Sequence, residues 1–146
     1  MSDQEPRDVS GRCLCGAVTV TAQVGKPILR ACHCQMCRRH TSGTFISLAT
    51  LPDTITVTGP AKTFRSSDWA QRGFCAECGS TLWYETTHDK QRHISAGLFD
   101  NAADAPLKLE FFSDQCPQGY ALAGEHRKMT TEETIALFAP NEGETS

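Results

Sequence analysis

CLCG at residues 13–16 and CAECG at residues 75–79 are two motifs in which a pair of cysteines is followed directly by glycine. Thiolates one or two residues apart can bind the same metal ion. The glycine is typical of a metal knuckle, in which backbone N–H groups turn toward the sulfur atoms and a side chain would clash. Joining the two motifs closes a long loop and stabilises the fold. We therefore predict one closed tetrahedral zinc site, with the ligands Cys13, Cys15, Cys75 and Cys78.

A third motif, CHCQMC at residues 32–37, places three more thiols within six residues. Seven of the eight cysteines in the chain thus lie in three short segments. Zinc has four protein ligands in structural sites, and three plus an open position in catalytic sites. Because seven divides into four and three, we expect two zinc ions per chain. The second would be an open, catalytic site with the ligands Cys32, Cys34 and Cys37.

The open position is one of several interpretations of the third motif. If either His33 or His40 supplied a fourth ligand, the site would be purely structural. Cys116, the remaining cysteine, is either a distant fourth ligand or a small buried side chain. Two cysteines of the motif could also be oxidised to each other, because thiolates at an empty site are reactive.

A zinc ion with three thiolates carries excess negative charge, so it is a weak Lewis acid and a poor activator of water. Such a soft site is suited to a sulfur ligand, and we infer chemistry on a thiol or a thiol adduct. Arg38 and Arg39 follow the motif directly. They either offset the thiolate charge and hold a substrate carboxylate, or are solvated. Four aromatic residues either line a pocket or pack in the core: Trp69, Phe74, Trp83 and Tyr84.

Length and charge limit the possible partners. A chain of 146 residues forms one domain, and a net charge of −3 argues against binding nucleic acid or anionic membranes. No stretch of eighteen apolar residues is present, so we expect no membrane span. Residues 1–10 lack the apolar segment of a secretory signal, which indicates a cytoplasmic protein with reduced cysteines. Metal binding is therefore favoured over a disulfide framework.

The pattern of alternation and turn residues predicts a mainly β domain with little helix. We expect strands at residues 17–22, 45–50, 54–58, 62–66, 82–86, 93–98 and 107–112. A short helix is expected at residues 35–40, and a second at residues 130–138, where Thr130 and Glu133 form a capping box. Ile135 and Phe138 would dock the second helix. We divide the chain into a disordered leader (1–10), a zinc-binding β domain (11–126), and a C-terminal helix with a frayed tail (127–146).

The three cysteine motifs, in this order, resemble the glutathione-dependent formaldehyde-activating enzyme family (the GFA domain), which includes centromere-protein-V-like members. The resemblance covers the segments GRCLCGAV (11–18), CHCQMCRRHTSG (32–43), GFCAECGSTL (73–82) and GLFD (97–100) followed by Pro106. It implies a single β-tent-like domain of short antiparallel strands. It also implies a structural zinc on Cys13, Cys15, Cys75 and Cys78, and a catalytic zinc on Cys32, Cys34 and Cys37.

The family is associated with making and breaking carbon–sulfur bonds. The resemblance therefore implies a zinc-dependent carbon–sulfur lyase that acts on a small-molecule thiol or thiol adduct, with glutathione as the candidate thiol. The alternative is a zinc-stabilised binding module with two structural zinc ions and no catalysis. A third interpretation is a redox enzyme of the methionine-sulfoxide-reductase type, which requires Cys116 as its catalytic thiol. The oligomeric state is not indicated by the sequence.

Overall fold

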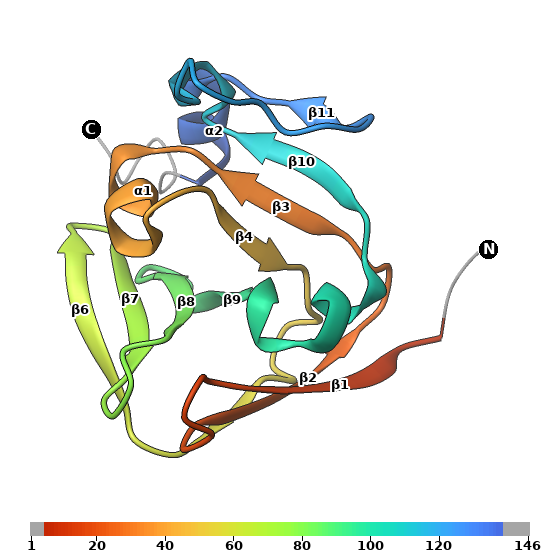
Figure 1. Ribbon diagram of the computed structural model, residues 1–146, viewed down its shortest axis with the longest axis vertical. Helices are drawn as coiled ribbons and strands as arrows, with labels where there is room; N and C mark the ends of the chain where they lie inside the picture. The colour runs from red at the N-terminus through yellow and green to blue at the C-terminus, as the bar shows by residue number, and fades with distance from the viewer. Residues whose placement is uncertain (1–4, 139–146) are drawn as a thin grey trace.

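Eleven strands and two α-helices form the regular structure of residues 5–138, the part of the chain that the computed structural model describes (Figure 1). A three-stranded antiparallel sheet has the order β1-β2-β5, and an eight-stranded sheet has the order β11-β10-β3-β4-β9-β8-β7-β6. The strands of the small sheet are β1 (Arg7–Arg12), β2 (Thr19–Val24) and β5 (Thr56–Thr58). Those of the large sheet are β3 (Leu29–Cys32), β4 (Phe45–Leu48), β6 (Ala61–Ser67), β7 (Ala70–Cys75), β8 (Thr81–Thr86), β9 (Gln91–Ser95), β10 (Leu107–Phe111) and β11 (Arg127–Lys128). The predicted mainly β fold class is confirmed, but the strands are not all antiparallel as expected, because β10 pairs with both β3 and β11 in parallel.

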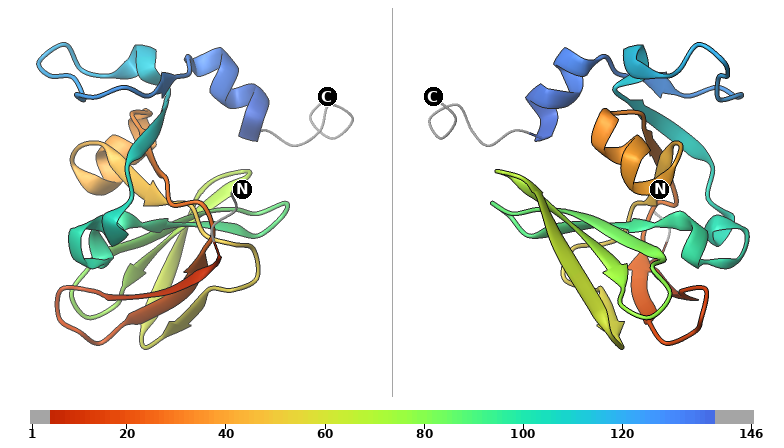
Figure 2. Two further views of the ribbon diagram at one scale, coloured as in Figure 1. Left: turned by 90° about the vertical axis from the view of Figure 1, so that its right-hand side faces the viewer. Right: turned by 60° about the vertical axis from the view of Figure 1, so that its left-hand side comes forward.

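The small sheet lies at one end of the molecule, and β10, β11 and the helix α2 (Thr131–Phe138) lie at the other (Figures 1 and 2). Side chains of β2 alternate strictly between exposed and buried positions, as expected for a half-buried strand. Its inward residues Val20, Ala22 and Val24 belong to the same core cluster as Leu48 and Ile94 of the large sheet. Burying each of these valines stabilises the fold by about 1.5–3 kcal/mol, so the core joins the two sheets.

The predicted disordered leader is wrong for Arg7–Ser10, because these residues form most of β1. The strand pairs with β2 along its whole length, from Arg7 opposite Val24 to Arg12 opposite Thr19. Its inward side chain Val9 is only 8% exposed. Residues 1–4 and the tail at residues 139–146 lie outside the described part of the chain.

The large sheet contains three strands that the sequence pattern did not predict: β3, β7 and β11. β3 and β7 carry arginines, Arg30 and Arg72, so neither strand shows a simple apolar alternation. The strand expected at residues 93–98 stops at Ser95, because the chain then turns into a 3-10 helix, η1 (Ala96–Leu98). Two further 3-10 helices follow, η2 (Asp100–Asp104) and η3 (Ser113–Gln115). The strand expected at residues 17–22 is β2, shifted toward the C-terminus.

Both predicted helices are present. The capping box of α2 is confirmed, because the Glu133 N–H donates to Thr130 Oγ1 at 3.2 Å and the Thr130 N–H donates to Glu133 Oε1 at 2.9 Å. The helix docks through Phe138, whose ring centroid lies 5.0 Å from that of Phe111. Ile135 does not help to dock it, since this side chain is 44% exposed. None of the helices described has the length and apolar character of a membrane span.

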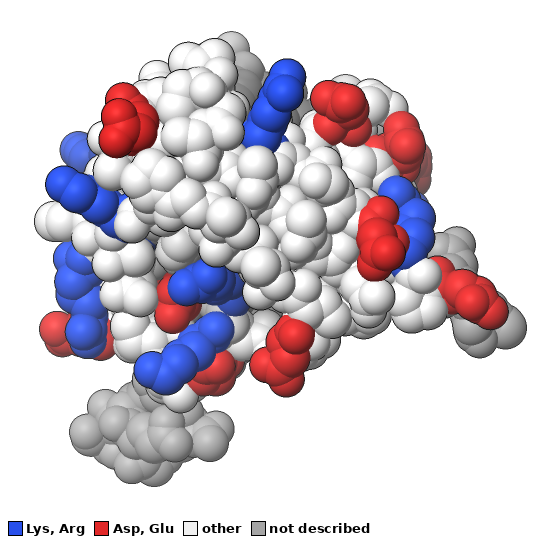
Figure 3. Space-filling model, turned by 90° about the horizontal axis from the view of Figure 1, so that it is seen from below, with Lys and Arg blue, Asp and Glu red and all other residues white. Residues whose placement is uncertain are grey.

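Charged side chains of both signs are interspersed on the face shown in Figure 3. Lys and Arg lie beside Asp and Glu there, so the potentials of neighbouring groups partly cancel.

Candidate metal centres and the adjoining pocket

The first cysteine group joins the loop after β1 to the end of β7. The sulfur atoms of Cys13, Cys15, Cys75 and Cys78 all lie within 4.8 Å of one another. The Sγ atoms of Cys13 and Cys15 are 3.7 Å apart, and those of Cys15 and Cys75 are 3.8 Å apart. Zn–S bonds of about 2.3 Å in a tetrahedron place the sulfur atoms about 3.8 Å apart. The group therefore fits a tetrahedral metal ion without rearrangement.

Backbone N–H groups surround these sulfur atoms, as the knuckle motifs predicted. The N–H of Val18 donates to Cys13 Sγ at 3.3 Å, and those of Glu77 and Cys78 donate to Cys75 Sγ at 3.3 and 3.4 Å. Such donors stabilise thiolate charge and orient the ligands.

The glycines of the two knuckles are needed for a different reason from the one we expected. Gly16 and Gly79 have φ of +83° and +80°, a conformation that other residues rarely adopt. Apart from the two neighbours of each glycine in the chain, no atom of the described residues lies within 4 Å of the place where a Cβ would sit. A steric clash is therefore not what selects glycine; the backbone conformation is.

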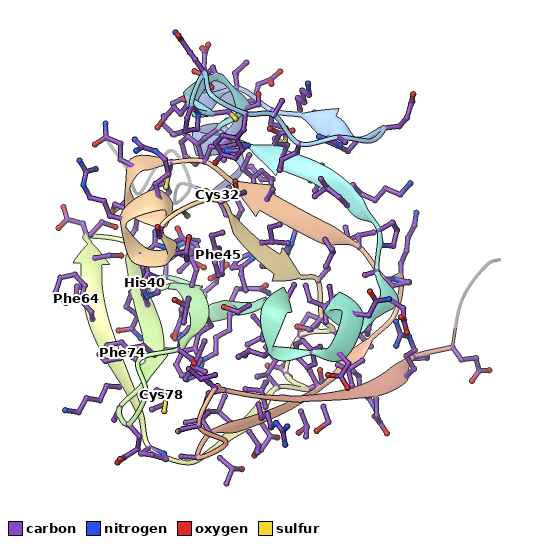
Figure 4. All side chains as sticks on the ribbon, viewed as in Figure 1. Cys32, His40, Phe45, Phe64, Phe74 and Cys78 are labelled. Atoms are coloured by element: carbon purple, nitrogen blue, oxygen red, sulfur yellow. The ribbon has the colours of Figure 1, made fainter. Side chains whose placement is uncertain are left out.

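The second cysteine group lies near α1 (Gln35–Thr41), well away from the first group, as the labelled Cys32 and Cys78 show in Figure 4. The sulfur atoms of Cys32, Cys34 and Cys37 lie within 4.8 Å of one another. Cys34 is the N-cap of α1, where its sulfur accepts the Cys37 N–H at 3.4 Å. The start of the helix therefore gathers the three thiols on one side of the motif.

Among residues 5–138, no fourth Cys, His, Asp or Glu places a ligand atom within 4.8 Å of all three sulfur atoms. Two of the three ligands proposed as alternatives, His33 and Cys116, form a separate group with Glu110. His40 lines an outer groove beside α1. The three-cysteine group is thus open in the way that the catalytic interpretation requires.

The positive charge beside this group comes from Arg72 of β7, which the sequence analysis did not single out. Arg72 Nη1 donates to Cys37 Sγ at 3.6 Å, although the residue is only 3% exposed. Its Nε donates to Ser66 Oγ at 3.4 Å, and the guanidinium lies 4.8 Å from the ring centroid of Tyr84. Neither Arg38 nor Arg39 lines the pocket at the cysteines, and Arg39 is exposed and donates to Gln35.

The surroundings favour a thiolate at Cys34 even without a metal. Hydrogen bonds from the Cys32 and Cys37 thiols lower the pKa of Cys34 to about 2, and the nearby Arg72 charge acts in the same direction. In the closed group, hydrogen bonds from the hydroxyl and backbone of Ser80 lower the pKa of Cys78 to about 5. The neighbouring thiols raise the pKa of Cys32 and Cys37 in the open group, and that of Cys15 to about 12 in the closed group. Metal ligation requires deprotonated cysteine, so Cys34 and Cys78 are the thiols of the two groups that are best prepared for it.

A pocket with a volume of about 60 Å³ adjoins the three thiols. Its walls are mainly aromatic and contain two guanidinium groups, from Arg30 and Arg72. Of the four aromatic residues that we expected to line a pocket or the core, Trp69 and Tyr84 line this pocket, and Trp83 is 3% exposed in the core. Phe74 lies in the outer groove.

A buried cluster of polar side chains connects the third cysteine motif to the C-terminal segment. His33 Nε2 lies 2.6 Å from Glu110 Oε2, and His126 Nε2 lies 2.5 Å from Glu110 Oε1. The side chains of Glu110, His33 and His126 are 4%, 0% and 1% exposed. Cys116 borders this cluster and donates to the Tyr120 carbonyl at 3.4 Å. Partial burial and the Glu110 charge raise the pKa of Cys116, which disfavours it as a redox nucleophile.

Three comparisons relate the chain to known proteins. Residues 8–115 match the profile of the family described as glutathione-dependent formaldehyde-activating enzyme. An uncharacterized lyase of Schizosaccharomyces pombe is 29% identical over 130 residues, which cover 88% of this chain and 95% of the relative. The crystal structure of a Rhodobacter sphaeroides protein superposes with a TM-score of 0.52 at 18% identity, over 68% of this chain and 99% of the other. At that identity the likeness shows the fold alone.

Proposed function

The chain belongs to the glutathione-dependent formaldehyde-activating enzyme family, and from this premise we propose that it is a zinc-dependent carbon–sulfur lyase. Its substrate would be the adduct of a small thiol with a carbonyl compound, and glutathione is the candidate thiol. The family match and the lyase relative support the reaction class. The observation that carries the proposal is the small pocket lined by three thiols for which residues 5–138 provide no fourth ligand.

Two zinc ions per chain are part of the proposal. Cys13, Cys15, Cys75 and Cys78 would hold a structural zinc, since their sulfur spacing matches a closed tetrahedron. Cys32, Cys34 and Cys37 would hold a catalytic zinc. When bound there, zinc supplies a soft Lewis acid that lowers the pKa of a substrate thiol and holds its sulfur.

The reaction itself is an addition and its reversal. In the direction of synthesis, the thiol releases its proton to water, and the sulfur forms a bond to the carbonyl carbon. The π electron pair of the C=O bond moves to the oxygen, which takes a proton from water to give a hydroxymethyl thioether. Lyase activity is the same sequence reversed. The aromatic walls of the pocket, which include Phe45, Phe111 and Phe138, exclude bulk water from the reacting atoms.

The size of the pocket limits what can enter it. One water molecule requires about 10–15 Å³ of such space, so the pocket holds roughly four to six small heavy groups. A sulfur atom with a one- or two-carbon adduct fits, whereas a whole tripeptide thiol does not. An outer groove of about 420 Å³ shares Met36 and Arg72 with the pocket, and its wall includes His40, Phe64 and Phe74 (Figure 4). We place the remainder of the thiol in this groove.

The proposal is tested by following glutathione and ¹³C-formaldehyde by NMR with the zinc-loaded protein. We expect S-hydroxymethylglutathione to form and to decompose faster than without protein. Cys37→Ser should abolish this acceleration while the zinc of the closed site is retained. Cys116→Ser is the matched control and should retain it, since this thiol faces the Glu110 cluster.

A rate equal to the uncatalysed rate, with both zinc ions bound, would contradict the proposal. The binding module would then be the better account. Loss of activity in Cys116→Ser with both zinc sites intact would instead favour the redox interpretation.

A further inference from the structure

We infer that Arg72, assisted by Arg30, binds the oxygen of the carbonyl component, so that the pocket is an oxyanion site beside the sulfur site. This inference rests on the proposed function. It assigns a catalytic role to two arginines that lie outside the cysteine motifs. These arginines would bind the carbonyl component of the substrate rather than the thiol.

Arg72 is held rigidly and still has a free donor. Its contacts with Cys37, Ser66 and the Tyr84 ring use Nη1, Nε and the face of the guanidinium. Nη2 is buried and has no hydrogen-bond partner among the described residues. A buried, unpartnered N–H of a charged group is costly, and such groups are normally paired. Because Arg72 lines the pocket, a small shift of the guanidinium would let a ligand bound there become the missing partner.

Arg30 has the same character on the neighbouring wall. It precedes Cys32 by two residues on β3, and its Nη2 makes one long hydrogen bond of 3.4 Å to the Leu48 carbonyl. Its Nε is buried without a partner among residues 5–138. Burial lowers the pKa of Arg30 to about 10, which leaves the guanidinium charged at neutral pH.

No carboxylate among the described residues balances these charges inside the pocket. Its lining consists of the two arginines, the three cysteines, aromatic side chains, Met36, Ser47 and His93. Burial, together with the Arg30 charge, lowers the pKa of His93 to about 3, so this imidazole is neutral and adds no further positive charge. Arg72 is buried, Arg30 is half-buried, and each has one buried donor atom without a partner among the described residues, which favours an anionic ligand group close to the thiols.

The reaction generates such a group. As the sulfur–carbon bond forms, the negative charge moves from the sulfur to the carbonyl oxygen, which is two bonds away. Nη1 of Arg72 already contacts a cysteine sulfur, Nη2 is the neighbouring nitrogen of the same planar group, and the side chain lines the pocket. One guanidinium can therefore contact both the sulfur site and the developing oxyanion. Preorganised charged donors at such an oxygen stabilise the transition state.

The inference is tested by the binding of two small thiols of similar acidity, mercaptoacetate and ethanethiol, to the zinc-loaded protein by calorimetry. Both have a sulfur and two carbons, but only mercaptoacetate carries oxygens near the position of the oxyanion. We expect wild-type protein to bind mercaptoacetate about 10- to 100-fold more tightly, the usual effect of one or two charge-assisted hydrogen bonds. Arg72→Met should reduce this ratio to near one, whereas the loss of its contact with Cys37 should affect the binding of both thiols alike.

Three further variants complete the test. Arg30→Met should lower the ratio partly, and Arg72→Lys should lower it because a lysine cannot contact the sulfur and the oxygen together. Arg127→Met is the control and should keep the wild-type ratio, because Arg127 is exposed on β11 and lines neither the pocket nor the outer groove. Circular dichroism and retention of one chelator-resistant zinc identify variants that fold.

The possible outcomes separate the inference from the proposed function. Equal binding of the two thiols to wild-type protein would overturn the inference while leaving a thiol site in place, and this comparison needs no variant to fold. An unchanged ratio in folded Arg72→Met would also overturn it. If neither thiol binds protein that holds two zinc ions, the proposed function itself fails.

Discussion

Replacing Glu110 with alanine is expected to destabilise the whole protein, although Glu110 is neither a cysteine nor part of a motif. Its carboxylate accepts hydrogen bonds from two buried histidines, His33 at 2.6 Å and His126 at 2.5 Å. Burial would raise the pKa of Glu110, but the hydrogen bonds from His126 and His33 outweigh it and keep the pKa below its usual range. The carboxylate is therefore charged at neutral pH, and the alanine variant leaves two buried imidazoles without their partner.

The expected magnitude follows from the burial of these groups. Removing one partner of a buried, hydrogen-bonded charge cluster costs about 3–5 kcal/mol. For a domain of this length, each kcal/mol corresponds to about 3–5 °C in Tm, so Glu110→Ala should lower Tm by roughly 10–25 °C. Glu110→Gln keeps the volume and one acceptor, and should cost about 1–3 kcal/mol.

Thermal unfolding of the zinc-loaded protein, followed by circular dichroism, measures these losses. Glu132→Gln is the control, because Glu132 is exposed in the first turn of α2 and should change stability by less than about 0.5 kcal/mol. A second readout is the rate at which a chelator removes the more labile zinc, since His33 lies between two of its proposed ligands. The reasoning would be refuted if Glu110→Ala were as stable as Glu132→Gln.

Two further predictions concern packing and pH. Gly73→Ala would place a Cβ 2.3 Å from Trp83 Cε2 and should lower the free energy of unfolding, measured in urea, by about 1–3 kcal/mol. Gly16→Ala has open space around the new Cβ but a φ of +83°, and should lower it by about 1 kcal/mol. A Gly73→Ala variant as stable as the wild type would contradict the packing described for Trp83. Between pH 6.5 and 3 the unfolded chain binds a proton at His93 that the folded protein excludes, because burial and the Arg30 charge lower the pKa of His93 to about 3. Stability should therefore fall as pH decreases through this range, by roughly 2 kcal/mol at pH 5, and His93→Gln should show a smaller loss between pH 7 and pH 5 in urea titrations.

The cysteine grouping could be predicted from the sequence because each motif is local. The spacing of Cys13 and Cys15, or of Cys75 and Cys78, determines which thiols can bind one ion, and the glycine after each pair indicates a turn. Similarly, the capping box at Thr130 and the alternation in β2 are properties of a few consecutive residues. The strands β3 and β7 were missed because each contains an arginine, half-buried in β3 and buried in β7, which a pattern based on hydrophobicity assigns to the surface.

The rest of the site depends on contacts between distant segments. Arg72 and Cys37 are 35 residues apart, and Glu110 and His33 are 77 residues apart. Nothing local distinguishes Arg72 from Arg38 or Arg39, which follow the motif but do not line the pocket. One signal was present at Glu110, which is a charged residue inside an otherwise apolar strand end, LEFF at residues 109–112. A charged residue is rarely buried without a partner. Its position in the strand could therefore have prompted a search for histidines that bind the Glu110 carboxylate.

The central claim is that the chain has one closed and one open metal centre, and zinc stoichiometry tests it most directly. We would measure zinc per chain by elemental analysis before and after mild chelation, with and without glutathione. The expected result is two zinc ions per chain, of which one is removed by the chelator and is protected by the thiol. One tightly held zinc, or two equally inert ones that do not respond to any thiol, would contradict the claim.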